Sequence, residues 1–215
     1  MNGLSYTIVP LEQGTSAWLA WRGRGIGASD APTIMGENPW KSAAQLLKEK
    51  CEGRSGGPNA AMARGTALEP EARKHYERRS GLSVVPACLQ SVKHEWLRAS
   101  VDGLCVEGSA VVEIKCGESV YRNSAMTRKV PDYYVGQLQH ILAVTGLPSI
   151  DFWCYLPGRP EVHLKMARDD GYIKRLLEEE ALFWRQIVEQ RGAGSKQTAS
   201  AARPAEQMSL SFEGG

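Results

Sequence analysis

The sequence predicts an α/β fold in which a mixed central sheet of about five strands is flanked by helices. Hydrophobic residues make up 42% and charged residues 23% of the 215 residues, a composition typical of a globular domain. Helical and strand patterns follow one another in the order helices, three strands, helix, two strands, helix. We therefore expect one domain over residues 1–190 and a flexible tail over residues 191–215.

The chain before residue 82 is predicted to be helical. "TSAWLAWR" begins with a Thr or Ser cap, and the glycines of "GRGIGASDAPTIMG" indicate a tight loop before a short helix. We expect Gly65 to interrupt the third long pattern and Pro70 to kink it. The predicted helices span residues 15–22, 42–52 and 59–81.

The remainder alternates strands with helices. The turn-rich "CVEGS" joins two strands in a hairpin. Pro131 and Gly146 mark the ends of one helix, and an apolar stripe from Ile173 to Ile187 predicts another. The small, polar "AGSKQTASAARPAEQ" predicts disorder. The expected strands span residues 82–90, 96–104, 110–116, 149–158 and 161–168, and the expected helices 131–145 and 169–192.

Charge and cysteine content exclude several classes of protein. The net charge is only +2, so any nucleic-acid surface must arise from local clustering. The five cysteines are scattered without a C-x-x-C pair, which argues against a disulfide framework, a thiolate zinc site and an iron–sulfur cluster. We see no signal peptide and no apolar run near the roughly 20 residues that span a bilayer, so we expect a cytoplasmic protein without a membrane partner.

The strand "AVVEIKC" carries charged residues among β-branched ones. Successive side chains of a strand alternate between faces, so Val112 and Ile114 point one way and Glu113 and Lys115 the other. Charged groups in such a strand must be solvated, paired or bound to a metal. Either this is an edge strand with a wet face, or Glu113 and Lys115 act together.

The preceding strand adds a second acid. The hairpin turn brings Asp102 near Glu113, and Ser100 shares the face of Asp102. Two carboxylates suit Mg²⁺, and a neighbouring lysine can orient a metal-bound water or stabilise charge on a phosphate. The spacing D-x₁₀-E-x-K matches the PD-(D/E)xK nuclease signature, with Val101 where that signature has Pro. By itself, an E-x-K pair is more typical of a solvated face.

Several motifs in one order carry a resemblance. They are "WRGRGIGASDAPTIMG", "RGTALEPEAR", "ASVDGL", "VEIKC" and "YYVGQLQHILAVTG". With them the chain resembles the lambda-type (YqaJ-like) viral recombinase exonucleases over roughly Trp18 to Val188. The resemblance implies a restriction-endonuclease-like PD-(D/E)xK core.

The resemblance also implies a catalytic site. Asp102 and Glu113 would be metal ligands with the Ile114 carbonyl as a third, Lys115 the catalytic lysine, and Glu69 the helix-borne acid that completes the site. The implied cofactor is Mg²⁺, with Mn²⁺ as a substitute, and two ions are typical of such cleavage. Taken from the sequence alone, Glu69 is equally a surface helix residue.

A second implied cluster binds a terminal 5′-phosphate. It comprises Arg24, Ser29, Ser100 and Gln137, with Gln139 a rival to Gln137. Glycines around Arg24 let backbone N–H groups approach an anion, and Ser29 begins a helix, whose N-terminus favours anions. The alternative is a plain serine cap beside a surface arginine.

Other positions have two interpretations each. Met62 matches an apolar wedge that separates DNA strands in the family, but a helical Met is more often core. We expect His140 to be a packed or solvent-edge histidine rather than a metal ligand. A basic run is more typical of a solvated helix face than of a phosphate track, and the six tryptophans are assigned to packing. The run comprises Arg64, Arg73, Lys74, Arg78 and Arg79.

The tail ends in "QMSLSF". This segment resembles the Q-x-x-L-x-F peptide that docks bacterial proteins on the replication sliding clamp. Gln207 would bond in a cleft, while Leu210 and Phe212 would fill an apolar pocket. The alternatives are an unstructured terminus or a strand that docks on its own protein.

Together these features predict a metal-dependent deoxyribonuclease of the alkaline exonuclease type. The resemblance implies digestion of one strand of linear duplex DNA from a 5′-phosphorylated end, which releases mononucleotides and leaves 3′ tails for strand annealing. It further implies a homotrimer and a single-strand annealing partner. The alternatives are an endonuclease on the same core, and a non-catalytic DNA-binding or clamp-recruitment module.

Overall fold

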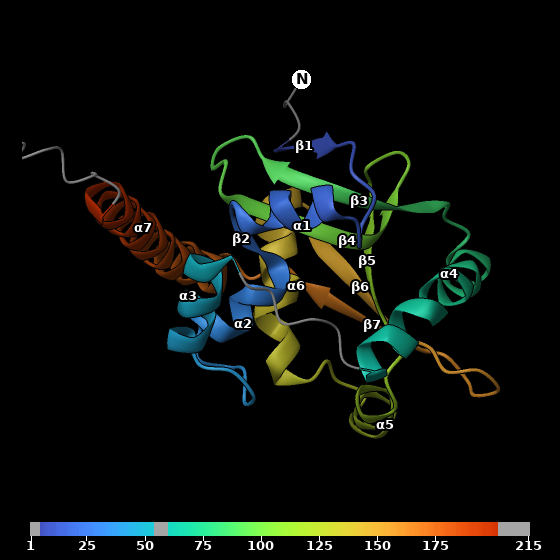
Figure 1. The fold of residues 1–215 in the computed structure, drawn as a ribbon. Helices are drawn as coiled ribbons and strands as arrows, with labels where there is room; N and C mark the ends of the chain where they lie inside the picture. The colour runs from blue at the N-terminus through green and yellow to red at the C-terminus, as the bar shows by residue number, and fades with distance from the viewer. Residues whose placement is uncertain (1–4, 54–59, 202–215) are drawn as a thin grey trace, which may run out of the picture.

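A seven-stranded mixed sheet lies at the centre of the molecule (Figure 1). The computed structural model describes residues 5–53 and 60–201, and the side chains of residues 60–62 and 194–201 lie outside that description. The strand order is β1-β3-β4-β5-β6-β7, and β2 pairs with β4. The strands are β1 (Tyr6–Val9), β2 (Ile26–Gly27), β3 (Val84–Ser91), β4 (Leu97–Cys105), β5 (Val111–Lys115), β6 (Ser149–Cys154) and β7 (Val162–Ala167).

Most neighbouring strands run antiparallel, with two exceptions. β5 and β6 are parallel, as are β2 and β4. The parallel pair needs a crossover, which helices α5 and α6 supply between β5 and β6. The hairpin between β4 and β5 pairs Gly103 with Val112 and Leu104 with Val111, so the register continues towards Asp102 opposite Glu113.

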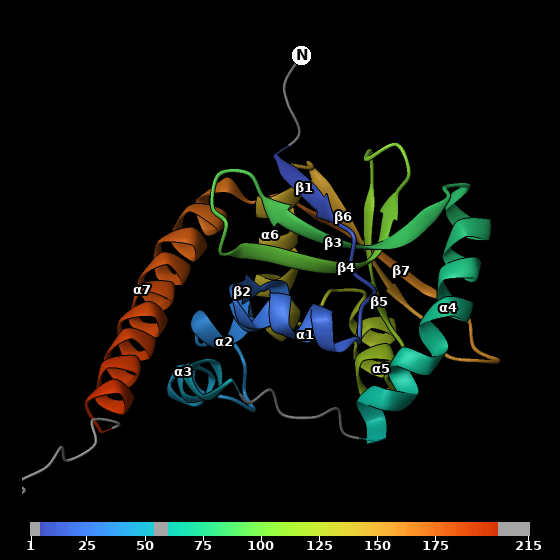
Figure 2. The same ribbon diagram turned by 45° about the horizontal axis from the view of Figure 1, so that its top comes forward.

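Helices cover both faces of the sheet. They are α1 (Ser16–Gly23), the 3₁₀ turn η1 (Ala28–Asp30), α2 (Ala31–Ile34), α3 (Ala43–Glu52), α4 (Ala60–Ser80), α5 (Glu118–Thr127), α6 (Asp132–Thr145) and α7 (Asp170–Ala201). Figures 1 and 2 show α4 and the long helix α7 at opposite ends of the molecule. No helix in residues 5–53 and 60–201 is both long enough and apolar enough to cross a bilayer.

The two faces of β5 enter different parts of the core. Val112 and Ile114 pack with Tyr76 of α4, whereas Val111 packs with Leu138 of α6. The period-two alternation of the strand therefore directs Glu113 and Lys115 towards the α6 face. This packing fixes which elements surround the charged pair.

The five predicted strands are β3 to β7, and the sheet adds two short ones. β2 has two residues, too few for an alternating pattern, and β1 is a four-residue edge strand. Helix α5 was missed because only three of its ten residues are buried, too few to mark an apolar stripe: Val120, Tyr121 and Ser124.

Two helical boundaries differ from the prediction. Gly65 does not interrupt α4, which is continuous and contains Pro70. α7 continues to Ala201, so the first part of the predicted flexible tail is helical. No proline interrupts this extension, because the first proline after α7 begins is Pro204.

Candidate active site

Strand β5 is internal to the sheet, between β4 and β6. The edge-strand interpretation of Glu113 and Lys115 is therefore wrong. Glu113 is only 3% exposed, although it is ionisable. A buried carboxylate needs compensating partners, so these two residues belong to a built polar site.

One oxygen of Glu113 collects two donors. Lys115 Nζ and Gln137 Nε2 each lie 2.5 Å from Glu113 Oε1. The other oxygen, Oε2, is buried and has no hydrogen-bond partner within the described part of the chain. Glu113 is thus fixed in position with one carboxylate oxygen left to accept a further donor or cation.

Asp102 stands beside this group on β4. Its Oδ2 accepts a hydrogen bond from the backbone N–H of Ile114 at 2.7 Å, and Arg73 Nε binds its carbonyl oxygen at 2.7 Å. Burial, and then repulsion from Glu113, raise the pKa of Asp102 well above its usual range, against the lowering effects of Lys115 and the Ile114 N–H. Asp102 therefore lies close enough to Glu113 for their charges to interact.

Lys115 is the nearest compensating cation. Its Nζ lies 4.7 Å from the centre of the Tyr134 ring as well as 2.5 Å from Glu113. Burial alone lowers the pKa of Lys115, but Glu113, Tyr134 and Asp102 outweigh it and raise that pKa above its usual value. Lys115 is consequently held as an ammonium group at the centre of the cluster.

Glu69 reaches the same region from α4. Burial raises the pKa of this half-buried carboxyl, and the charges of Lys115 and Glu113 act on it in opposite directions. The structure thus brings together the predicted residues Glu69, Asp102, Glu113 and Lys115, with the Ile114 backbone among them. The Ile114 carbonyl as a metal ligand stays a prediction.

These residues suit a hard cation. Burial and the charge of Glu113 raise the pKa of Asp102 and the pKa of Glu69, so a cation bound between these carboxylates would be stabilised. Glu113 Oε2 is also a buried acceptor with no partner among the described residues. Within the same described ranges, no three acidic, histidine or cysteine groups already form a metal-ligating arrangement. The donors therefore fit Mg²⁺ chemically, and side chains would adjust when it binds.

The residues of the predicted phosphate cluster make the following contacts in the structure. Gln137 joins Glu113 in the acidic site, while Ser100 Oγ accepts a hydrogen bond from Trp18 Nε1 at 2.8 Å. Ser29 is exposed and accepts a hydrogen bond from Arg22, a residue that the sequence analysis did not select. Arg24, which it did select, is also exposed. Two arginines in "WRGRG" precede the loop, and only the folded loop distinguishes them.

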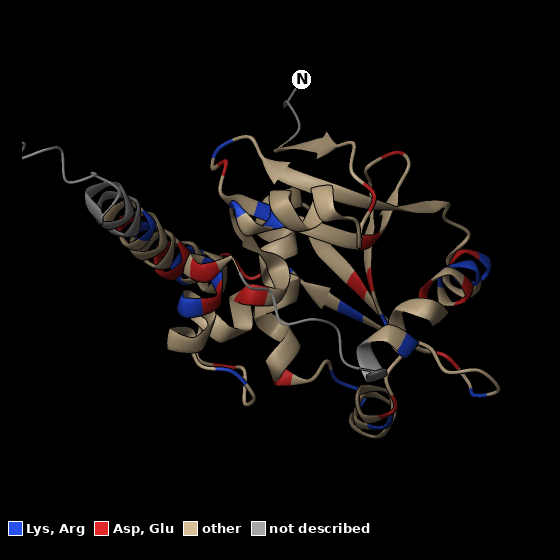
Figure 3. Ribbon diagram, viewed as in Figure 1, with Lys and Arg blue, Asp and Glu red and all other residues tan. Residues whose placement is uncertain are grey.

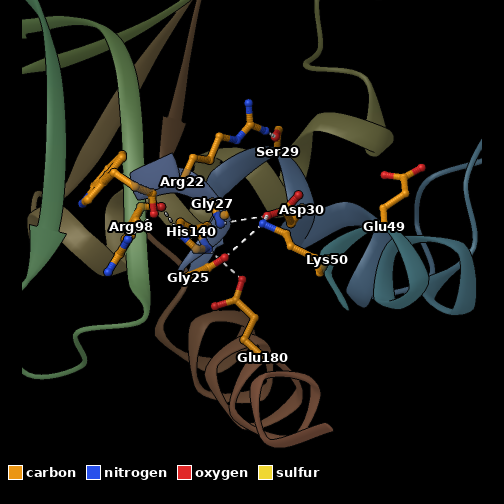
Figure 4. A network of polar contacts seen from close by, with 12 residues as sticks. Arg22, Gly25, Gly27, Ser29, Asp30, Glu49, Lys50, Arg98, His140 and Glu180 are labelled. Carbon is orange, nitrogen blue, oxygen red and sulfur yellow. Dashed lines mark hydrogen bonds and ion pairs between the residues drawn. The ribbon is translucent and has the colours of Figure 1, made fainter. Parts of the chain in front are cut away.

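A buried ion pair supports the loop that carries Ser29 (Figure 4). Lys50 Nζ lies 2.6 Å from Asp30 Oδ2 and donates to the Gly25 carbonyl at 3.0 Å, while the Gly27 N–H donates to Asp30 at 2.9 Å. Burial alone raises the pKa of Asp30, but Lys50 and Arg22 outweigh it and lower that pKa. A Cβ on Gly25 would lie 2.5 Å from the Trp96 carbonyl, so only glycine fits there.

His140 lies under the same loop, fully buried. Its Nδ1 is 2.6 Å from Glu180 Oε1, and its Nε2 is 2.9 Å from the Arg98 carbonyl (Figure 4). The expectation of a packed histidine is confirmed. Gln139 bonds to the Ala167 carbonyl at 2.9 Å and accepts from the Asp169 N–H at 3.0 Å, so the structure places Gln137, rather than its rival, at the acidic site.

The predictions for the basic run, the tryptophans, Met62 and the C-terminal peptide have different outcomes. Acidic and basic residues are interspersed along α4, as a solvated face requires, and Arg73 binds the Asp102 backbone (Figure 3). The packing assignment is wrong for Trp40, which is 73% exposed. The Met62 side chain and the peptide of Gln207, Leu210 and Phe212 lie outside the described residues.

Comparison with known proteins points in one direction. The family profile of the YqaJ-like viral recombinase domain matches residues 17–148. The YqaJ protein of Bacillus subtilis strain 168 is 31% identical over 184 residues, which cover 82% of this chain and 57% of that protein. The chain thus spans a little over half the length of this curated relative.

Solved structures agree with this match. The alkaline exonuclease LHK-Exo from Laribacter hongkongensis is 28% identical with a TM-score of 0.75, covering 87% of this chain and 100% of that one. LHK-Exo in complex with dAMP matches with a TM-score of 0.76, at the same identity and coverage. A phage-related exonuclease from Haemophilus somnus 129PT, 14% identical with a TM-score of 0.60, shares the fold over 80% of this chain and 96% of its own. These similarities support a nuclease, and the profile match over more than half of the chain shows that it belongs to the YqaJ-like viral recombinase domain family.

Proposed function

We propose that this protein is a Mg²⁺-dependent exonuclease that digests one strand of linear duplex DNA from a 5′-phosphorylated end. It leaves 3′ single-stranded tails for recombination by strand annealing. The observation that carries the proposal is the buried cluster of Glu113, Asp102 and Lys115 on adjacent strands, with Glu113 Oε2 unpartnered among the described residues. The similarity to LHK-Exo supports the exonuclease class.

The residues divide the work of phosphodiester hydrolysis. Asp102 and Glu113 would hold the metal with Glu69, and the bound ion would supply Lewis-acid activation of water and phosphate. Lys115, held as an ammonium group, would orient the attacking water and stabilise negative charge on the phosphate. Gln137 keeps Glu113 Oε1 occupied, so that Oε2 is the oxygen presented to the ion.

The loop over residues 22–30 would receive the terminal 5′-phosphate. Arg22 and Ser29 already bond one another there, and Arg24 is exposed close by in sequence. Guanidinium groups and a serine hydroxyl are suitable donors for a phosphate dianion. The buried Lys50–Asp30 pair would keep these donors in place.

The partners follow from the same proposal. We infer a single-strand annealing protein that receives the 3′ tail, a homotrimeric assembly, and docking on the sliding clamp through Gln207, Leu210 and Phe212. Each inference rests on the resemblance described above.

The test uses a linear duplex with one 5′-phosphorylated and one 5′-hydroxyl end, labelled separately, beside a closed circle. We expect Mg²⁺-dependent loss of label from the phosphorylated end, no cleavage of the circle, and no digestion by Glu113→Gln. Equal loss of label from both ends would contradict the proposed 5′-phosphate pocket. Cleavage of the closed circle would favour an endonuclease. No cleavage with Mg²⁺ or Mn²⁺ would favour a DNA-binding module.

A further inference from the structure

Trp40 is an exposed aromatic residue held by an ordered loop. It is 73% exposed between α2 and α3. The side chain of Asn38 fixes this loop, because its Oδ1 accepts from the Trp40 N–H at 2.9 Å and its Nδ2 donates to Thr33 Oγ1 at 2.8 Å. Ser42 then caps α3 in a capping box with Gln45. A large apolar side chain is thus presented to solvent by a preformed scaffold, and packing does not account for it.

Ring contacts connect Trp40 to the acidic site. The Trp40 ring meets Tyr133 edge to face with centroids 4.9 Å apart, and Tyr133 lies 4.7 Å from Tyr134. Tyr134 in turn lies 4.7 Å from Lys115 Nζ. Tyr133 also precedes Gln137 by four residues on α6, so both lie on one face of that helix. The Trp40–Tyr133 pair therefore stands one helical turn from the residue that binds Glu113.

The surface beside Trp40 is hollowed. An open hollow of about 460 Å³ is lined by Trp40 and by Ile34, Asn38, Pro39, Ser42 and Gln45, among others. The lining is neutral apart from Lys41, whose Nζ pairs with Glu49 at 2.6 Å. The flat ring of Trp40, edged by the amide and hydroxyl groups of Asn38, Gln45 and Ser42, matches a nucleobase, which has apolar faces and a polar rim.

We propose that the Trp40–Tyr133 pair is a nucleobase-stacking site that holds one of the first three bases of the digested strand. The site takes an unpaired base by contact with its π-face, which tolerates any sequence. Ring contacts run from Trp40 through Tyr133 and Tyr134 to Lys115. We therefore assign the stacked base to the DNA strand that enters the acidic site. The assignment of that strand rests on the proposed function.

A binding cycle tests this inference without cleavage. Short 5′-phosphorylated single strands carry a 3′ fluorophore and either all bases or one abasic residue at position 1, 2 or 3. Anisotropy in EDTA gives the Kd of the full chain and its variants. We expect Trp40→Ala to weaken binding of the intact strand by about tenfold, the order of one base stacked on an aromatic ring. One of the three abasic strands, the one that lacks the base that Trp40 stacks on, should bind the wild type and Trp40→Ala with equal Kd. Neither of these two complexes then contains a base stacked on residue 40.

Two control variants separate stacking from other effects. Trp40→Phe keeps an aromatic face, so it should retain most of the affinity and discriminate between intact and abasic strands. Val106→Ala removes a similarly exposed apolar side chain from the turn between β4 and β5, so it should leave every Kd unchanged. Thermal melts establish that each variant is folded.

Three outcomes would overturn the inference. They are an unchanged Kd in Trp40→Ala, an equal loss of affinity for intact and all abasic strands, and a changed oligomeric state in Trp40→Ala, which would assign Trp40 to contact between copies. The end-labelled duplex assay is read separately. If the binding cycle couples Trp40 to one base but the duplex is not digested, only the proposed function is refuted. If the duplex is digested but no base is coupled to Trp40, only the stacking site is refuted.

Discussion

Gln137 donates a hydrogen bond from Nε2 to Oε1 of Glu113 at 2.5 Å, across the space between α6 and β5. Both side chains are buried, at 9% and 3% exposure. A ligand carboxylate is most effective when a neighbouring group fixes its orientation. The amide therefore determines which Glu113 oxygen is available to a cation.

Replacement of Gln137 by Leu is expected to lower activity by about 10- to 100-fold, as the loss of a group that orients a metal ligand does. The loss should come mainly as a higher Mg²⁺ concentration for half-maximal rate. Initial rates over a Mg²⁺ titration measure it. Gln139→Leu is the matched control, because Gln139 bonds to Ala167 and Asp169 instead. A wild-type Mg²⁺ requirement in Gln137→Leu would contradict the prediction.

Replacement of Lys115 by Met should lower the single-turnover rate by about 10²- to 10⁴-fold, the range for a positioned catalytic group. The methylene stem is largely retained, so DNA binding should change little. Because Glu113, Tyr134 and Asp102 raise the pKa of Lys115, the wild-type rate should show no loss from lysine deprotonation up to about pH 9. Rapid-quench rates over a pH series test both statements, and a lysine titration below that pH would refute the ammonium role.

The His140–Glu180 pair should contribute strongly to stability. His140→Ala leaves the Glu180 carboxylate buried without its imidazole, which typically costs about 3–5 kcal/mol of unfolding free energy. The double variant His140→Leu/Glu180→Leu removes both charges and should cost much less. Urea unfolding monitored by circular dichroism compares the two. Equal losses in both would show that the pair is not energetically coupled.

The same pair should make stability depend on pH. Burial lowers the pKa of His140, but Glu180 outweighs it, so the folded-state pKa lies above the usual 6.5. Burial likewise raises the pKa of Glu180 above 4.5 despite His140. The folded state then holds protons that the unfolded state has lost, so the stabilisation present at low pH is lost as pH rises from 4.5 for Glu180, and from 6.5 for His140. Unfolding free energies of the wild type minus the double leucine variant should decrease over this range, and an increase would reverse our assignment of the shifts.

Gly103 should not tolerate a side chain. A Cβ there would lie 2.7 Å from Val112 Cγ1 and 2.9 Å from Val84 Cγ2, next to Asp102. We expect Gly103→Ala to lose about 1–3 kcal/mol of unfolding free energy and to reduce activity through displacement of Asp102. Gly65→Ala is the control, because its Cβ meets nothing within 4 Å in α4 and alanine favours a helix by about 0.5–1 kcal/mol. Thermal melts that rank the two variants the other way would contradict the packing.

Local pattern predicted which residues of the site lie together, and the family resemblance favoured a catalytic site over a solvated face. Period-two alternation placed Glu113 and Lys115 on one side of β5, and the hairpin turn brought Asp102 near them. The target of Gln137 was not predictable, because it depends on how α6 packs across the sheet. Arg22 was missed for the same reason, since its contact with Ser29 forms only when the loop folds back.

The exposure of Trp40 shows a different limit. Tryptophan is usually buried, so composition favours packing. In the structure, the Asn38 side chain and the helix cap at Ser42 hold the backbone on either side of this exposed ring. Sequence patterns report which residues suit a core. They do not report which of those residues a loop places at the surface instead of in the core.

Helix α7, near the end of the chain, supports a loop that lies near its beginning. Glu180 completes the bonds of His140, and Arg191 donates to the carbonyls of Gly23 at 2.9 Å and Lys50 at 2.5 Å, so the loop of Arg22 and Ser29 is secured by residues far later in the chain. During synthesis, residues up to 191 must leave the ribosome before these contacts can form. A nascent chain therefore contains Asp102, Glu113 and Lys115 well before it contains the helix whose side chains secure this loop.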